Sequence, residues 1–255
     1  MHVDVVATVN ELRQEDILHK TVIVIDTLRA TSSMIVGVAQ GAEEIIPVEI
    51  IGQAKSLYAQ YPTSLLAGER NSKKIPGFHL GNSPTEWLSA PLKGQRIIFT
   101  TTNGTRAILK SSKAEQILIC SLLNGQRCAR QAISHQTDIT ILCAGTRNQF
   151  AIEDGLTAGY LIEQLFHMTE GLTISDLGWA LYHAYLASRH RLSEIIRLGQ
   201  AGQRLIQLGC HKDLIICCQL DKYPVVARFK PPPSLAPLQE NRKDDYFIAS
   251  HHRMN

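Results

Sequence analysis

Short apolar runs alternate with polar clusters and helical patterns through most of this chain. Residues 22–25 are four branched apolar residues, which end on Asp26 and lead into a helical pattern at about residues 31–40. Such a run is typical of a strand buried on both faces of a sheet. The same order returns later, with apolar runs at residues 64–67, 96–100, 116–120 and 138–143. This alternation indicates βαβ units, so we predict an α/β fold with three layers (α/β/α) around a largely parallel or mixed sheet.

The length and composition are those of a globular protein. With 255 residues, the chain can form one large domain or two small ones. The composition changes beyond residue 228, where prolines at 231–233 precede a charged run. We therefore predict one α/β domain over residues 1–228, with two α/β lobes as the alternative, and a Pro-rich, charged tail over residues 229–255. We expect the last strand at residues 213–218.

Charge, hydropathy and cysteine usage argue against several functions. The formal net charge is +3 and dense Lys/Arg clusters are absent, which argues against a nucleic-acid partner. No apolar run approaches the roughly 20 residues that a membrane-spanning helix needs, and the N-terminus lacks the pattern of a signal peptide. We therefore expect a cytoplasmic protein with no membrane partner. The six cysteines form no CxxC pair, which argues against zinc and for buried thiols.

Polar clusters follow the predicted strands. The carboxyl ends of parallel strands lie at one edge of a sheet, where α/β proteins bind their ligands. We therefore expect four clusters to converge there, although they are spread over more than a hundred residues. They are Asp26 with Arg29 and Thr31, Glu69 with Arg70, Asn103 with Arg106, and Arg147 with Glu153 and Asp154.

These residue types suit an anion and a hard cation. Magnesium prefers oxygen ligands, and it is often held by one or two carboxylates and a substrate phosphate. Arginines, hydroxyl groups and helix N-termini bind anions. The alternative is that each cluster is a helix cap or a surface ion pair. The motifs GxxxxGK[ST], GxGxxG and GxSxG are absent, which argues against a P-loop, a dinucleotide-binding loop and an α/β-hydrolase.

Six motifs together resemble the 2-phosphosulfolactate phosphatase (ComB) family. They occur in order between about residues 3 and 227, as VIDTLRAT at 24–31, AGER at 67–70, GFHLGNSP at 77–84, TTTNGTRA at 100–107, CAG at 143–145 and ED at 153–154. The resemblance implies a ComB-like α/β fold and a Mg²⁺-dependent phosphatase. The implied reaction is hydrolysis of 2-phospho-3-sulfolactate to 3-sulfolactate and phosphate, a step of coenzyme M biosynthesis. It also suggests a homodimer.

The resemblance also assigns roles to residues of this chain. We expect Asp26, Glu69 and Asp154 to bind the Mg²⁺ ion, Glu153 to act as a base for the attacking water, and Asp26 and Arg29 to take part in catalysis. A phospho-aspartyl intermediate on Asp26 stays open, although Leu28 stands where a DxD motif has its second Asp. The expected substrate-binding residues are Arg29, Thr31, Arg70, Asn82, Ser83, Thr102, Asn103, Thr105 and Arg106.

Two other functions are compatible with the same motifs. The chain could be a phosphatase of this fold that acts on another small phosphorylated acid, because no residue selects the sulfonate uniquely. It could also be a non-catalytic protein that binds an anionic metabolite. The acidic residues of the VIDTLRAT, AGER and ED motifs, which are all intact, argue against the second alternative.

Overall fold

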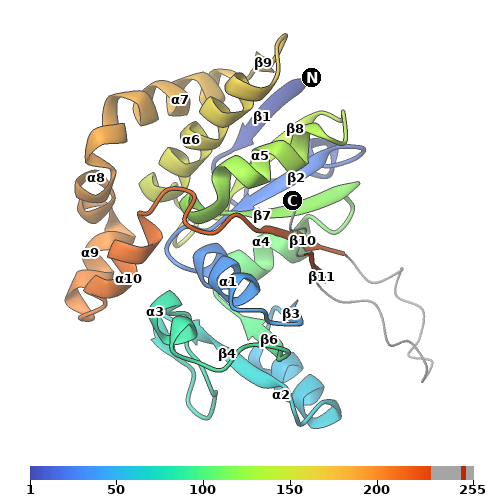
Figure 1. The fold of residues 1–255 in the computed structure, drawn as a ribbon, viewed down its shortest axis with the longest axis vertical. Coiled ribbons are helices and arrows are strands. Elements are labelled where there is room, and N and C mark those ends of the chain that lie inside the picture. Colours follow the sequence, from blue (N-terminus) through green and yellow to red (C-terminus); the bar gives the residue numbers. More distant parts are fainter. Residues whose placement is uncertain (231–247, 251–255) are drawn as a thin grey trace.

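The computed structural model describes residues 1–230 and 248–250 of the chain. In this part of the chain, eleven strands form one sheet in the order β5-β4-β6-β3-β11-β10-β7-β2-β8-β1-β9 (Figure 1). Their bounds are β1 His2–Val6, β2 Thr21–Ile25, β3 Glu44–Pro47, β4 Leu65–Arg70, β5 Lys73–Lys74, β6 Arg96–Thr100, β7 Gln116–Cys120, β8 Ile139–Cys143, β9 Thr173–Ile174, β10 Val226–Phe229 and β11 Ile248–Ser250.

The sheet consists of two parallel parts that are joined by antiparallel strands. Strands β7, β2, β8, β1 and β9 pair in parallel, as do β3, β6 and β4. Between them, β10 pairs antiparallel with β7 and with β11, and β11 pairs antiparallel with β3. The prediction of an α/β fold with a largely parallel or mixed sheet is therefore confirmed. Because three antiparallel pairings separate β7 from β3, however, the two parts do not share one strand direction.

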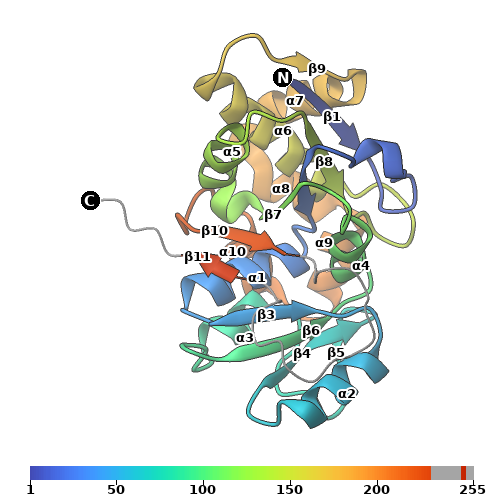
Figure 2. The same cartoon turned by 90° about the vertical axis from the view of Figure 1, so that its right-hand side faces the viewer.

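Helices cover both faces of the sheet, as Figures 1 and 2 show. Helices α5, α6 and α7 pack on one face of the β7–β2–β8–β1 part, and α2 packs on β4 and β6. From α7 to α10 the helices follow one side of the molecule, and α10 contacts α3. The bounds are α1 Ala30–Ala39, α2 Ile51–Gln60, α3 Pro84–Leu88, α4 Gly104–Lys110, α5 Gly125–Ile133, α6 Ile152–Met168, α7 Asp176–Ser188, α8 Leu192–Leu198, α9 Gln200–Gln207 and α10 His211–Cys217.

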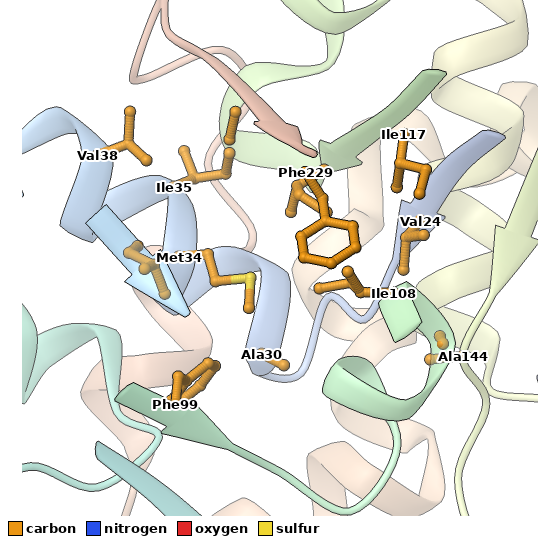
Figure 3. Close-up of a cluster of buried hydrophobic side chains, with 14 of the residues drawn as sticks. Val24, Ala30, Met34, Ile35, Val38, Phe99, Ile108, Ile117, Ala144 and Phe229 are labelled. Carbon is orange, nitrogen blue, oxygen red and sulfur yellow. The ribbon is translucent and has the colours of Figure 1, made fainter. Parts of the chain in front are cut away.

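Strand β2 shows why the structure has three layers. Val22 and Val24 point into the hydrophobic cluster that contains α1 and α4, whereas Ile23 and Ile25 point into the cluster under α5 and α6. This alternation follows from the two-residue period of a strand. In Figure 3, Phe229 of β10 lies in the first of these clusters, near side chains of α1 and β2. The end of β10 is therefore part of the core.

Helix α1 is buried over almost its whole length. Its residues 30–38 are all buried, and it contacts β7 and β10 as well as β3. A helix that is apolar on all sides belongs in a core. Since α1 follows directly after β2 and Asp26, this burial fixes the position of the loop that carries Asp26.

The C-terminal region contains a helix where the sequence predicts a strand. The strand predicted at residues 213–218 is wrong, because residues 213–217 lie in α10 and Cys218 is the C-cap of that helix. Leu214 and Cys217 are buried while Ile215 is 57% exposed, which is the spacing of a helix that packs on one face. Of the predicted tail, Phe229 and residues 248–250 pair into the sheet, and the remaining positions from 231 lie outside the described residues.

Among the described residues, none of the helices has both the length and the apolar character that crossing a membrane requires.

Candidate active site

A cavity of about 420 Å³ lies where the loops of the two sheet parts meet. Six of the residues singled out in the sequence line it on one side: Asp26, Arg29, Glu69, Asn82, Thr102 and Asn103. They come from the β2–α1 loop, from β4, from the segment before α3 and from the β6–α4 loop. The expected convergence therefore occurs in part, and between two sheet parts rather than along one parallel edge. We call this space the first cavity.

Asp26 is held by the N-termini of two helices. Its Oδ1 accepts a hydrogen bond of 3.1 Å from the backbone N–H of Ala30 in α1, and the N–H of Gly104 in α4 also donates to the carboxylate. Burial raises the pKa of Asp26 from its usual 3.8 to about 6, and repulsion from Glu69 adds to the increase. The N–H of Ala30 and the charge of Arg29 oppose it.

The position of α4 depends on the absence of a side chain at Gly104. A Cβ atom at this residue would lie 2.5 Å from the Cβ of Ala30 and 2.7 Å from Oδ2 of Asp26. Only glycine therefore allows the N-terminus of α4 to approach the carboxylate this closely.

Glu69 is fixed by three hydrogen bonds. Its Oε1 accepts from the backbone N–H and the hydroxyl of Thr102, at 2.8 and 2.9 Å, and its Oε2 accepts from the N–H of Ser72 at 2.7 Å. The side chain is almost fully buried, but it lines the first cavity beside Asp26. The two carboxylates therefore face one space and repel each other.

Arg29 is anchored by a buried ion pair that the sequence did not predict. Its Nη1 lies 2.6 Å from Oδ2 of Asp213 in α10, and both side chains are almost fully buried. Its Nη2 donates to the carbonyl of Ser72 at 3.0 Å. The other oxygen of Asp213 accepts from the hydroxyl of Ser83 at 2.7 Å and from the N–H of Thr85 at 3.2 Å. Asp213 therefore joins the β2–α1 loop to the start of α3.

Helix α9 contributes a wall that sequence reasoning missed. Arg204 lines the first cavity, and it donates to the hydroxyl of Ser72 at 3.0 Å and to the carbonyl of Asn71 at 2.6 Å. Residues 200, 203 and 207 of α9 line it too. In the sequence these residues form a polar stripe of helical period, which ordinarily faces solvent. Arg147, whose cluster was expected here, also lines the cavity.

Several other predicted substrate-binding residues do not line the first cavity. The buried Thr31 hydroxyl donates to the carbonyl of Asp26, and the buried Thr105 hydroxyl donates to the carbonyl of Thr101. Arg70 donates to the carbonyls of Glu69 and Glu49. The hydrogen bonds of these side chains to backbone carbonyls stabilise the loops that form the first cavity. Two more predicted residues lie outside the lining, namely Ser83, which caps α3, and the half-buried Arg106 in α4.

Two acids lie at the start of α6. Asp154 lies behind the first cavity, and Glu153 lies beside it, in the wall of a neighbouring cavity. Both oxygens of buried Asp154 accept backbone N–H groups, from Thr27 at 2.8 Å and from Gly145 at 3.0 Å. Burial raises the pKa of Asp154 well above its usual range, and repulsion from Glu153 and Asp26 adds to this. Glu153 lines a neighbouring cavity. Burial raises its pKa to about 7, and repulsion from Asp26 contributes.

The first cavity offers oxygen donors that suit Mg²⁺. Within the described residues, no group of three or more His, Cys, Asp or Glu side chains could hold a metal ion. However, the cavity presents the carboxylates of Asp26 and Glu69, and the buried Oδ1 of Asn82 has no hydrogen-bond partner in the described residues. Two carboxylates and an amide oxygen fit an ion that takes its other ligands from water and a phosphate.

The arrangement of Asp154 differs from the one expected of a metal ligand. Its oxygens already bind the residue after Asp26 and the loop after β8, and it does not line the first cavity. The geometry therefore favours a role in holding the Asp26 loop.

Comparison with known proteins links the chain to one protein family. The family model described as 2-phosphosulpholactate phosphatase matches residues 6–232. The probable 2-phosphosulfolactate phosphatase of Caldanaerobacter subterraneus subsp. tengcongensis is 42% identical over 225 residues, which cover 88% of this chain and 93% of the relative. Proteins with the same name from Symbiobacterium thermophilum and Clostridium tetani are 36% and 35% identical, over 84% and 90% of this chain and 93% and 98% of the relatives.

Proposed function

Because this chain belongs to the 2-phosphosulfolactate phosphatase family, whose members are phosphoric monoester hydrolases, we propose that it hydrolyses 2-phospho-3-sulfolactate in the first cavity. The reaction would be Mg²⁺-dependent, and its products are 3-sulfolactate and phosphate. Within this proposal, the reaction serves as a step of coenzyme M biosynthesis.

The observation that carries the proposal is the setting of Asp26. A buried carboxylate lies between two helix N-termini, at the bottom of a cavity that Arg29, Arg147 and Arg204 also line. A substrate with a phosphate, a sulfonate and a carboxylate needs such positive charge for binding, and its transition state needs it for stabilisation. The volume of the cavity suits a small metabolite.

In this proposal Asp26, Glu69 and the amide oxygen of Asn82 hold the Mg²⁺ ion. When bound, the ion supplies a positive charge that stabilises a phosphoryl oxygen. The helix N–H groups of Ala30 and Gly104 keep the Asp26 carboxylate in one orientation, and Thr102 does the same for Glu69. Asp154 keeps the backbone after Asp26 in place.

The remaining chemistry concerns water and the leaving group. A water molecule attacks the phosphorus atom, the bond from phosphorus to the ester oxygen breaks, and that oxygen leaves with a proton. Glu153, with a pKa of about 7, is suited to exchange a proton near neutral pH, although its carboxylate lines the neighbouring cavity. Attack by Asp26 itself, followed by hydrolysis of a phospho-aspartyl group, stays the alternative route.

A second candidate is hydrolysis of another small phosphorylated acid. Arginine binds sulfonates, carboxylates and phosphates through the same N–H groups, so the lining of the first cavity does not select the sulfonate. Homodimer formation and a cytoplasmic location stay predictions.

Phosphate release from a panel of substrates tests the proposal. The panel contains 2-phospho-3-sulfolactate, 2-phospholactate and the phosphoglycerates, each assayed with Mg²⁺ and with EDTA. We expect Mg²⁺-dependent release that is fastest with the sulfonated ester. Faster release from another member would favour the second candidate, and no release from any member would favour a binding protein.

A further inference from the structure

A second cavity adjoins the first one. It has a volume of about 560 Å³, and it lies between the start of α6 and the junction of α8 and α9. Both cavities share the wall formed by Thr146, Leu198, Gln200 and Ala201. The two cavities are therefore direct neighbours.

The lining of the second cavity is mostly apolar. Phe150, Ala151, Ile152 and Ile195 contribute to it together with the shared Leu198. Phe150 is 46% exposed and Leu198 is 72% exposed, so large apolar side chains are in contact with water at its mouth. Covering such surface with an apolar group is favourable by about 25 cal/mol per Å².

The substrate of the proposed function leaves this cavity unexplained. 2-Phospho-3-sulfolactate carries three acidic groups on three carbon atoms, and it has no apolar part. The second cavity has no basic side chain in its wall, and its titratable group is the acid Glu153. Three arginines line the first cavity, beside the two carboxylates that hold the Mg²⁺ ion in the proposed function. Charge therefore directs the acidic groups of a ligand to the first cavity and an uncharged part to the second.

We propose that the second cavity is a substrate subsite for the apolar side chain of a phosphorylated 2-hydroxy acid, whose phosphate and carboxylate lie in the first cavity. This inference rests on the proposed function, because it places a phosphate ester beside Asp26. It extends the substrate class to esters with an alkyl side chain.

The test is a homologous series of esters. Phosphate release is measured for 2-phospholactate and for the 2-phosphorylated forms of hydroxybutyrate, hydroxypentanoate and hydroxyhexanoate. Each added methylene group that is buried is expected to raise kcat/KM by about fourfold. If kcat/KM does not rise along the series while 2-phospholactate and 2-phospho-3-sulfolactate are hydrolysed, the subsite is wrong and the proposed function stands. If no ester releases phosphate, the proposed function fails, and the subsite fails with it.

Matched Ile→Trp variants locate the effect. Ile195→Trp fills the second cavity, so we expect the ratio of kcat/KM between the longest and the shortest ester to fall close to one. The control is Ile215→Trp, at an exposed position on α10 outside both cavities, which is expected to keep the wild-type ratio. An unchanged ratio in Ile195→Trp would contradict the subsite. A second result would also contradict it. If kcat/KM of the wild type does not depend on chain length, and sedimentation shows that Ile195→Trp converts a dimer to monomers, a second copy of the chain covers this cavity.

Discussion

At the scale of single residues, the site depends on how closely the backbone approaches Asp26. The N–H groups of Ala30 and Gly104 both point at its carboxylate, and they partly offset the cost of burying it. The hydroxyls of Thr31 and Thr105, which looked like substrate ligands in the sequence, instead stabilise the two turns that present these N–H groups.

Replacing Gly104 by alanine tests this arrangement. The new Cβ would overlap Ala30 and Oδ2 of Asp26, so α4 has to move away from the carboxylate. We expect a loss of about 1–3 kcal/mol in the free energy of unfolding and a larger loss of phosphatase activity. Urea denaturation and phosphate release measure the two effects.

Gly52→Ala is the control for this substitution. Gly52 lies in α2, and the nearest atom to an added Cβ is 3.9 Å away. This variant is expected to keep full activity and to gain up to about 1 kcal/mol of stability, because alanine favours helices. Equal activity in Gly104→Ala and Gly52→Ala would show that α4 need not touch Asp26.

Part of this site could be predicted from the sequence because strand ends mark it. Asp26 follows an apolar run directly, and Thr102 and Asn103 follow another, so elementary rules of α/β folds identify them. Arg204 and Asp213 lie on helices in the last quarter of the chain. A polar residue on an amphipathic helix is ordinarily solvated, and the pattern does not reveal that these two face a cavity or a buried arginine.

At the level of helices and strands, α9 and α10 supply side chains to a site whose other residues follow strands. Helix α9 supplies a wall of the first cavity, and α10 supplies Asp213, which binds Arg29 and the start of α3. The chain from 200 to 217 therefore connects loops of both sheet parts. Helix α10 could not be predicted from the sequence, because a short apolar run over six residues is compatible with both a buried strand and a short helix.

Asp213→Asn tests the connection between α10 and the site. The substitution leaves the buried guanidinium of Arg29 without its closest counter-charge, so we expect a loss of about 3 kcal/mol in the free energy of unfolding. The KM of the substrate should change as well, because Arg29 lines the first cavity. Urea denaturation and steady-state kinetics provide the two measurements.

The matched control is Glu194→Gln, which removes an acid from the exposed pair with Arg191. Exposed pairs contribute at most about 1 kcal/mol, so stability and KM should hardly change. If the two variants lose equally little stability, the Arg29–Asp213 pair does not hold the site together.

At the scale of the whole molecule, the fold buries acids whose charges repel one another. Burial raises the pKa of Glu153 to about 7, that of Asp26 to about 6, and that of Asp154 in the same direction. When these groups are ionised, they lower the free energy of unfolding. Such a loss of stability is common at catalytic sites.

The stability of the metal-free protein should therefore depend on pH. Between about pH 4.5 and pH 7, Glu153 is protonated in the folded state and ionised in the unfolded state, so the folded state binds more protons. Its contribution to stability is present at low pH and is lost as the pH rises through about 7. In EDTA, we expect Glu153→Gln to raise Tm at pH 8 and to leave it nearly unchanged at pH 5.

Thermal unfolding of Glu153→Gln and wild type at both pH values measures this difference. Glu194→Gln again serves as the control, since an exposed acid should alter Tm little at either pH. A larger gain for Glu153→Gln at pH 5 than at pH 8 would contradict the raised pKa.

The order of the strands in the whole sheet also explains why its two parts could not be predicted from the sequence. The runs that form β2 and β6 look alike in the sequence, yet they belong to parts that run in different directions. The antiparallel strands between them, β10 and β11, come from the far end of the chain and pair over more than a hundred residues. Strand periodicity carries no information about such partners.

If phosphate esters are hydrolysed at Asp26, phosphate release should depend on the carboxylate of this residue, and the variant Asp26→Asn measures that dependence. Asparagine has nearly the same shape and no charge, so the variant should fold as stably as the wild type. With Mg²⁺ and the best substrate of the panel, we predict a fall in kcat of about 10³-fold or more, while Asp176→Asn at an exposed position of α7 keeps full activity. Turnover by folded Asp26→Asn within about tenfold of the wild type would contradict the claim.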